Sequence, residues 1–167
     1  MRLSLHGLET TMSVSLREID TGNFWQCLRL KIADGQEKFV AGNAISIAES
    51  KIYSYLTPLT VYSDDEIIGF VMYGRDPETG NFWLVRLMID AKHQGKGYGK
   101  SATRAVIETL NEDFGCQEVF LSFVPENVGA EKLYSDLGFE RTGETDDDGE
   151  IIMRFKSTHN RRQTTDN

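Results

Sequence analysis

The spacing of hydrophobic and polar positions predicts a chain that alternates between strands and helices. Residues 14–19 alternate apolar and polar side chains, which is typical of a half-buried strand. Asn23 is a candidate N-cap for a helix that runs to about residue 31. A second helix is predicted over residues 43–56, where apolar positions recur on one helical face. The residues of that face, which we expect to be buried, are Ile45, Ala48, Ile52, Tyr55 and Leu56.

The middle of the chain contains the most hydrophobic segment. Residues 60–62 and 67–73 flank two aspartates and predict a β-hairpin. Residues 82–89 are nearly all apolar, which indicates a strand buried on both faces. A glycine-rich turn then leads into a helix that reaches about residue 114, with Gly115 suited to end it.

The last third of the chain predicts a strand, a short helix and a closing hairpin. The strand covers residues 119–124, and the helix begins at Asn127 and stops at Gly138. Residues 139–142 and 150–155 form the hairpin. The order β-α-α-β-β-β-α-β-α-β-β combines hairpins with a central β-α-β crossover. It predicts an α/β (α+β) protein with a mixed, mostly antiparallel sheet of about six to seven strands and flanking helices.

Length and composition indicate one globular domain. The chain has 167 residues, and we assign residues 13–156 to the domain, residues 1–12 to a flexible extension and residues 157–167 to a flexible polar tail. No apolar run approaches the roughly 20 residues that span a bilayer, and because no apolar segment follows Arg2 we do not expect a secretory signal. Cys27 and Cys116 are lone cysteines, which indicates reduced thiols in a cytoplasmic protein that does not bind membranes.

The charge balance narrows the class of partner. The chain carries 26 acidic and 18 basic residues, a net charge of −8, whereas a duplex nucleic-acid binder is typically basic. An acidic protein attracts polycations. The run Asp146–Asp148 is simplest to interpret as a solvated hairpin tip. No histidine has a second ligand residue at metal-binding spacing, so we expect no metal site.

The segment Gln94–Lys100 (QGKGYGK) is the strongest candidate for chemistry. Its glycines let the backbone approach a ligand, and the following helix begins there with free N–H groups and a positive dipole end. Such a turn binds anions, most often phosphate. A P-loop is a poor alternative, because its first glycine falls on Gln94. The dinucleotide fingerprint GxGxxA matches residues 97–102, but it lies too far beyond the strand.

The same loop also matches the pattern [Q/R]-x-x-G-x-[G/A], with Gln94, Gly97 and Gly99 in register. A second block, residues 125–139, matches N-x-x-A-x-x-[L/F]-Y-x-x-x-G-F. With these two blocks, residues 14–156 resemble the GNAT N-acetyltransferases, and most closely their bacterial spermine/spermidine acetyltransferases. The resemblance implies the GNAT fold, acetyl-CoA as cosubstrate and direct transfer of acetyl to a primary amine of a cationic acceptor such as a polyamine.

The resemblance also implies roles for individual residues. Tyr134 is the expected general acid, and the backbone N–H of Met88 is expected to stabilise the oxyanion. Members of the family are often dimers, so a homodimer is possible by analogy. The residues expected to bind acetyl-CoA are Leu87, Met88, Ile89, Gln94, Gly95, Lys96, Gly97, Tyr98, Gly99, Lys100, Asn127 and Lys132.

The general base is not evident from the sequence. Relatives of the polyamine type often carry a carboxylate on the strand at the position of Val85. Glu37, Glu49 and a chain of water molecules are the candidate replacements, and the two glutamates are also candidate acceptor-binding residues. Arg86 lies in an apolar run and needs a partner if it is buried. The alternatives that remain are a catalytically weak acetyl-CoA sensor and an acetyltransferase for another amine, such as an aminoglycoside or a protein N-terminus.

Overall fold

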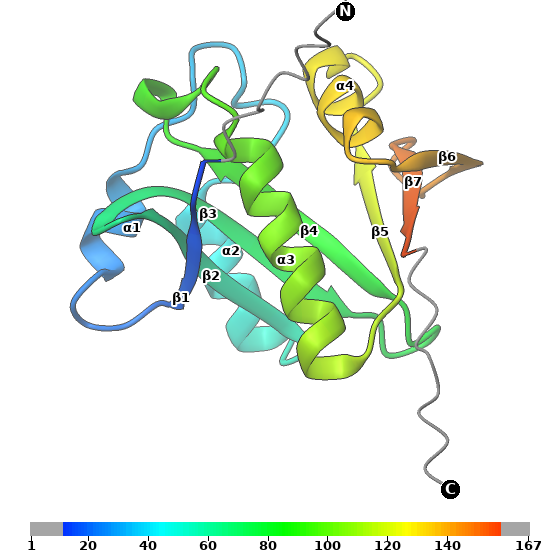
Figure 1. Ribbon diagram of the computed structural model, residues 1–167, viewed down its shortest axis with the longest axis horizontal. Helices are drawn as coiled ribbons and strands as arrows, with labels where there is room; N and C mark the ends of the chain where they lie inside the picture. Colours follow the sequence, from blue (N-terminus) through cyan, green and yellow to red (C-terminus); the bar gives the residue numbers. More distant parts are fainter. Residues whose placement is uncertain (1–11, 158–167) are drawn as a thin grey trace, which may run out of the picture.

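The computed structural model describes residues 12–157, so the predicted extension and tail lie almost entirely outside the described residues. A seven-stranded sheet in the order β1-β2-β3-β4-β5-β7-β6 forms the centre of the domain (Figure 1). Only the β4–β5 pair is parallel, which confirms a mixed, mostly antiparallel sheet. The strands are β1 Ser15–Glu18, β2 Leu56–Ser63, β3 Glu66–Arg75, β4 Phe82–Ile89, β5 Glu118–Phe123, β6 Glu140–Thr145 and β7 Ile151–Lys156.

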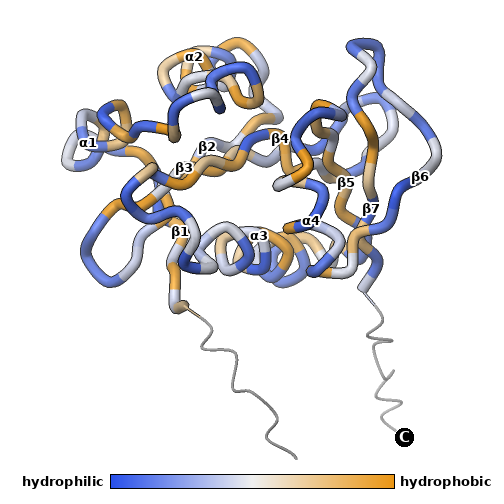
Figure 2. Tube along the Cα trace, turned by 90° about the horizontal axis from the view of Figure 1, so that it is seen from above, coloured by the Kyte–Doolittle hydropathy of each residue, from blue (hydrophilic) through white to orange (hydrophobic). Residues whose placement is uncertain are grey.

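Helices cover both faces of the sheet. The helices are α1 Phe24–Arg29, α2 Asn43–Ile52, α3 Tyr98–Phe114 and α4 Val128–Asp136, with a 3₁₀ turn at Ala91–His93. Figure 2 shows α1 and α2 on one face, and α3 and α4 on the other. We refer to these as the α2 face and the α3 face. Among the helices of residues 12–157, none has the length and hydrophobicity needed to cross a bilayer.

Each face of the sheet has its own hydrophobic core. The larger core lies on the α3 face and includes Leu110, Leu121 and Met153, all of them almost completely buried. The smaller core lies on the α2 face and contains Cys27, Phe70, Met72 and Met88. The sheet is thereby packed between two apolar layers.

Strands β4 and β5 separate soon after they begin. Their pairing is confined to Phe82 with Val119 and Trp83 with Phe120. β4 continues to Ile89 and β5 to Phe123, so the remaining backbone of each strand faces a widening gap. This gap explains why the expected burial of β4 on both faces holds only near its ends. Side chains in its middle, at Val85, Arg86 and Leu87, are only partly buried.

Two of the residues predicted to begin or end helices are confirmed in that role. Asn127 caps α4, where its Oδ1 accepts a hydrogen bond from the Ala130 N–H at 3.1 Å. Gly115 ends α3 in the left-handed conformation, with φ of 64°. Asn23 precedes α1 as expected, but its side chain does not cap the helix. It instead accepts from the Asp20 N–H and donates to the Glu18 carbonyl, which anchors the turn before the helix.

The predicted buried face of α2 is wrong. Ile45 is 59% exposed and Ile52 78% exposed, and the helix ends at Ile52, so Leu56 opens β2. The side chains of α2 that reach the interior are Asn43, Ser46 and partly Ile47. Asn43 explains the orientation, because its Nδ2 donates to the Cys27 carbonyl at 2.9 Å and so holds this side of the helix inward.

The homodimer expected by analogy with the family stays a prediction.

Candidate active site

A cavity of about 1300 Å³ occupies the gap between β4 and β5. Its wall includes the middle of β4, the glycine loop with the start of α3, and the end of β5. Helix α4, the β6–β7 turn and residues 36–41 complete it. The cavity therefore combines segments that are far apart in the sequence, and the divergence of two neighbouring strands creates it.

The glycine loop lies at one side of this cavity and has the open backbone expected of an anion site. Gly95 and Gly97 have φ values of 74° and 89°, a region that residues with a Cβ rarely adopt. Gly97 is also the N-cap of α3, a helix of 17 residues, so the free N–H groups of its first turn lie at the loop. Neither glycine has a neighbouring atom within 4 Å of the place where a Cβ would stand. The open backbone suits a pyrophosphate.

Two lysines carry positive charge in the same cavity wall as the glycine loop. Lys100 lies in the first turn of α3 and Lys132 on α4, and both line the cavity. Their Nζ atoms lie 2.7 and 3.2 Å from Oδ2 of Asp136. The hydrogen bonds from both lysines lower the pKa of the Asp136 carboxyl. Lys96 differs from them, because it is exposed and is not part of the cavity wall.

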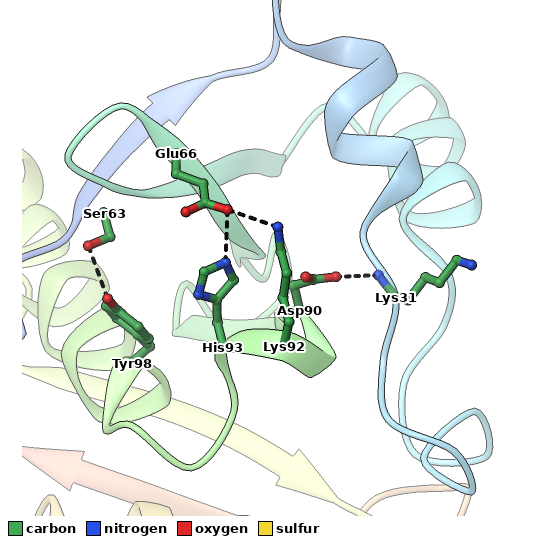
Figure 3. Close-up of polar contacts among 7 residues, drawn as sticks. All are labelled: Lys31, Ser63, Glu66, Asp90, Lys92, His93 and Tyr98. Atoms are coloured by element: carbon green, nitrogen blue, oxygen red, sulfur yellow. Dashed lines mark hydrogen bonds and ion pairs between the residues drawn. The ribbon is translucent and has the colours of Figure 1, made fainter.

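Ion pairs brace the turn that leads into the loop (Figure 3). Oε1 of Glu66, at the start of β3, lies 2.8 Å from Nζ of Lys92 and 3.1 Å from Nε2 of His93. Hydrogen bonds from these two side chains lower the pKa of Glu66, and the same contact raises the pKa of Lys92. On α3, the Tyr98 hydroxyl lies 3.2 Å from Oγ of Ser63. The hairpin of β2 and β3 therefore supports the loop from behind.

The backbone of β4 at the gap carries the three residues expected to meet the thioester arm. On its other edge this segment pairs with β3, where Leu87 faces Val71 and Met88 faces Phe70. The Met88 side chain is buried in the smaller core. Leu87, Met88 and Ile89 all line the cavity. Their backbone is thus held rigidly on one edge and is unpaired with β5 on the other.

Tyr134 is buried at the wall of the cavity on the α3 face. Its ring packs against Phe139, with ring centroids 5.6 Å apart. Burial disfavours the phenolate and raises the pKa of Tyr134 far above its ordinary value. The hydroxyl therefore stays protonated at neutral pH. Asn127, at the start of the same helix, also lines the cavity.

The two carboxylates expected at the acceptor site lie in different places. Glu37 lines the large cavity, in the segment that connects α1 and α2. Glu49 instead lines a separate cavity of about 350 Å³. Its Oε2 lies 3.4 Å from Nη2 of Arg86, which confirms the expectation that Arg86 has a partner. The Arg86 Nη1 donates to the Val85 carbonyl at 2.9 Å.

Other acidic side chains enter the cavity wall from the β6–β7 turn. The run Asp146–Asp148 was expected to be a solvated hairpin tip. Asp147 fits this expectation, whereas Asp146 and Asp148 line the large cavity together with Glu150. Figure 2 shows this turn extending toward the side of the sheet on which α2 lies. Sequence analysis missed two residues of the cavity wall, Glu150 and its hydrogen-bond partner Ser122. The available signal was Ser122 itself, a polar residue inside a predicted apolar strand. Within residues 12–157, no cluster of three or more His, Cys, Asp or Glu could hold a metal ion.

Comparison with known proteins identifies the fold and the reaction. The sequence profile of the acetyltransferase (GNAT) family matches residues 26–139. The chain belongs to this family. It is 32% identical over 148 residues to a spermine/spermidine N(1)-acetyltransferase of Bacillus subtilis strain 168, covering 85% of this chain and 97% of that relative. A probable spermine N(1)-acetyltransferase of Bacillus subtilis subsp. natto matches to the same extent.

Solved structures agree on the GNAT fold. Aminoglycoside acetyltransferase AAC(6')-Ib in complex with coenzyme A superposes with a TM-score of 0.72 at 21% identity, covering 86% of this chain and 95% of that chain. PaiA N-acetyltransferase from Thermoplasma acidophilum, also with coenzyme A, gives 0.61 at 18% identity, covering 87% and 99%. This GNAT protein is an acetyl-CoA-dependent N-acetyltransferase, and acetyl-CoA is its cosubstrate.

Proposed function

We propose that the acceptor is a small polycationic amine of the spermidine and spermine class. The observation that carries this proposal is a group of acidic side chains in the cavity wall, apart from Asp136, which pairs with two lysines. The group consists of Glu37, Asp146, Asp148 and Glu150. Carboxylates at several positions suit a flexible molecule with several ammonium groups, each of which gains from a charge-assisted hydrogen bond. The net charge of −8 attracts such a molecule over a longer range.

The relatives support the same acceptor. The Bacillus proteins that match this chain along nearly their whole length are named for spermine and spermidine. The aminoglycoside acetyltransferase is similar at only 21% identity, so that likeness supports the fold alone. We propose a cytoplasmic location, where polyamines and acetyl-CoA meet and where the free thiols of Cys27 and Cys116 stay reduced.

For the cosubstrate, we assign the pyrophosphate to the backbone from Gly95 to Lys100, and charge neutralisation to Lys132. The unpaired edge of β4 at Leu87 and Ile89 and the Asn127 side chain would hold the pantetheine arm. The Asp90 N–H donates to Ile68 of β3, and N–H groups alternate between the two edges of a strand, so the Met88 N–H also points to β3 rather than to the gap. We therefore assign the oxyanion to an N–H on the gap edge, at Leu87 or Ile89 in place of Met88, and protonation of the departing sulfur to Tyr134. Each of the assigned groups except Lys96 lines the large cavity, which supports the assignment.

The test is a free-thiol assay with acetyl-CoA and a panel of acceptors: spermidine, spermine, putrescine, lysine, kanamycin and a peptide with a free N-terminus. We expect the highest kcat/KM with spermidine or spermine. The double variant Glu37→Gln/Asp148→Asn should raise the KM for spermidine by about tenfold and change the KM for lysine less, because lysine has fewer ammonium groups to lose contacts. Faster turnover of kanamycin or the peptide would overturn the polyamine assignment and leave the reaction unchanged.

A further inference from the structure

A hydrogen-bonded pair, to which no catalytic role has been assigned, lies in the cavity wall. The Ser122 hydroxyl, on β5, donates to Oε2 of Glu150 at 2.7 Å. Glu150 immediately precedes β7, and both side chains line the large cavity. The backbone of Glu150 is fixed by Asp146, because the Glu150 N–H donates to Asp146 Oδ1 at 2.8 Å and the Glu150 carbonyl accepts from the Asp146 N–H at 3.0 Å.

The strand alternation shows from which face Ser122 approaches the cavity. Val119, Leu121 and Phe123 are buried in the larger core on the α3 face. Side chains alternate along a strand, so Ser122 and Phe120 point to the α2 face. The ring contact between Phe120 and Trp83, with centroids 5.3 Å apart, agrees with this, because the two side chains lie on the same side of the sheet.

Tyr134 approaches the same cavity from the opposite face. It belongs to the larger core, on the side of α3 and α4. The gap between β4 and β5 connects the two faces. Acetyl transfer to an ammonium requires that the amine lose a proton while the sulfur gains one. This arrangement suits both steps, because a proton donor for sulfur lies on one face and a hydroxyl–carboxylate pair lies on the other.

The acceptor needs such a base. A primary amine with a pKa of about 10.4 is only about 0.04% neutral at pH 7. Val85 supplies no carboxylate on β4. Glu49 is engaged by Arg86 and lies outside the large cavity. Glu37 lines the cavity but is exposed, on a connecting segment rather than a strand.

We propose that Glu150 is the general base of this acetyltransferase and that Ser122 relays the proton to it. Ser122 Oγ accepts a proton from the acceptor ammonium while its own hydroxyl proton passes to Glu150 Oε2. The neutral nitrogen forms its bond to the acetyl carbon, and the bond from that carbon to sulfur breaks. Tyr134 donates its proton to the sulfur and regains one from solvent. The nitrogen releases its second proton to solvent, and Glu150 releases the proton that it received through Ser122. Because Tyr134 takes one proton back from solvent, the net release is one proton per turnover.

The test uses the full-length protein and the acceptor that it acetylates fastest in the panel, so it does not depend on the polyamine assignment. We expect Glu150→Gln to lower kcat/KM by about 10²–10³ at pH 7, within the range of general-base catalysis. The deficit should shrink by up to tenfold per pH unit toward pH 10, because the free amine then supplies itself in the neutral form. Ser122→Ala should show the same trend with a smaller deficit.

Three further measurements separate a base from a structural role. Coenzyme A affinity by calorimetry and the thermal midpoint should stay near the wild-type values in Glu150→Gln. In the protein without acetyl-CoA, the ¹³C carboxyl signal of Glu150 should shift when the acceptor is added. Asp147→Asn is the matched control, because it removes a charge from the same turn outside the cavity, and its kcat/KM should stay within about twofold. A deficit that is uniform from pH 6 to 10, or wild-type activity of Glu150→Gln at pH 7, would overturn the proposal.

Discussion

The amide side chains of Gln36 and Gln94 form a reciprocal pair. Nε2 of Gln94 donates to Oε1 of Gln36 at 2.9 Å, and Nε2 of Gln36 donates back at 3.2 Å. Gln94 opens the glycine loop, and its Nε2 also donates to the Ile89 carbonyl at 3.0 Å. Gln36 belongs to the segment between α1 and α2 that carries Glu37. The pair therefore joins the loop proposed for the pyrophosphate to the segment proposed for the acceptor.

This contact predicts that Gln36→Ala weakens acceptor binding more than cosubstrate binding. The variant removes the Gln36 amide and with it both hydrogen bonds of the pair, each of which contributes a net stabilisation of about 0.5–1.5 kcal/mol. We expect the KM for the acceptor to rise about three- to tenfold, while the Kd for coenzyme A changes less than twofold. Steady-state kinetics and calorimetry measure the two quantities.

Gln94→Ala is the informative comparison for that variant. It removes the same pair and the contact with Ile89, so both the acceptor KM and the coenzyme A Kd should rise. If Gln36→Ala weakened coenzyme A binding as much as Gln94→Ala does, the segment before α2 would support the glycine loop rather than the acceptor.

Tyr134→Phe tests the proton donor. The variant keeps the buried ring and its packing on Phe139, so we expect coenzyme A affinity to be nearly unchanged. Loss of a general acid should lower kcat by about 10²–10⁴. Because burial raises the pKa of Tyr134, the wild-type hydroxyl stays protonated through pH 10, and kcat should show no decline attributable to this residue below that pH. Tyr62→Phe, which alters another buried tyrosine outside the cavity, should retain activity. Equal kcat in the two variants would remove Tyr134 from the mechanism.

The parts of the fold that sequence analysis predicted correctly depend on local chemistry. Asn127 caps its helix through a side chain that reaches three residues ahead, and the glycines of the loop adopt conformations that other residues avoid. The α2 face was mispredicted because the hydrophobic stripe gave no weight to Asn43, whose hydrogen bond to the Cys27 carbonyl directs the polar side of the helix inward. A stripe of apolar residues does not determine which side of a short helix meets the sheet.

The candidate site could be predicted only where it is continuous in sequence. The glycine loop and the segment around Tyr134 each form one block, and both line the cavity. Gln36 meets Gln94 across 58 residues, and Ser122 meets Glu150 across 28. The first pair depends on where the segment between α1 and α2 meets the loop after β4, and the second depends on the register of β7 beside β5. A single sequence contains no local signal for either feature.

Gly97→Ala separates backbone strain from loss of the phosphate cradle. Forcing a Cβ into the left-handed conformation costs about 1–2 kcal/mol, although nothing within 4 Å obstructs the added atom. Gly143→Ala is a matched control, because Gly143 has the same φ of 89°, is equally open and lies outside the cavity. Both variants should lose similar unfolding free energy in urea titrations. Only Gly97→Ala should also weaken coenzyme A binding, by about tenfold or more, and equal weakening in both would contradict the proposed cradle.

The two cysteines should differ in reactivity, which matters for any assay that detects released thiol. Cys27 is fully buried, and desolvation raises its pKa from 9.0 to about 11. At pH 7.5 its thiolate fraction is therefore about a hundredfold lower than that of an unperturbed cysteine. Cys116 is partly exposed, and burial raises its pKa less. In the folded protein, iodoacetamide should modify Cys116 well before Cys27, as measured by peptide mass spectrometry over time, whereas in urea both should react at similar rates. Raising the pH toward 11 should increase labelling of Cys27 only as its thiolate forms. Rapid modification of Cys27 at pH 7.5 in the folded state would show that α1 and α2 open often enough to expose the smaller core.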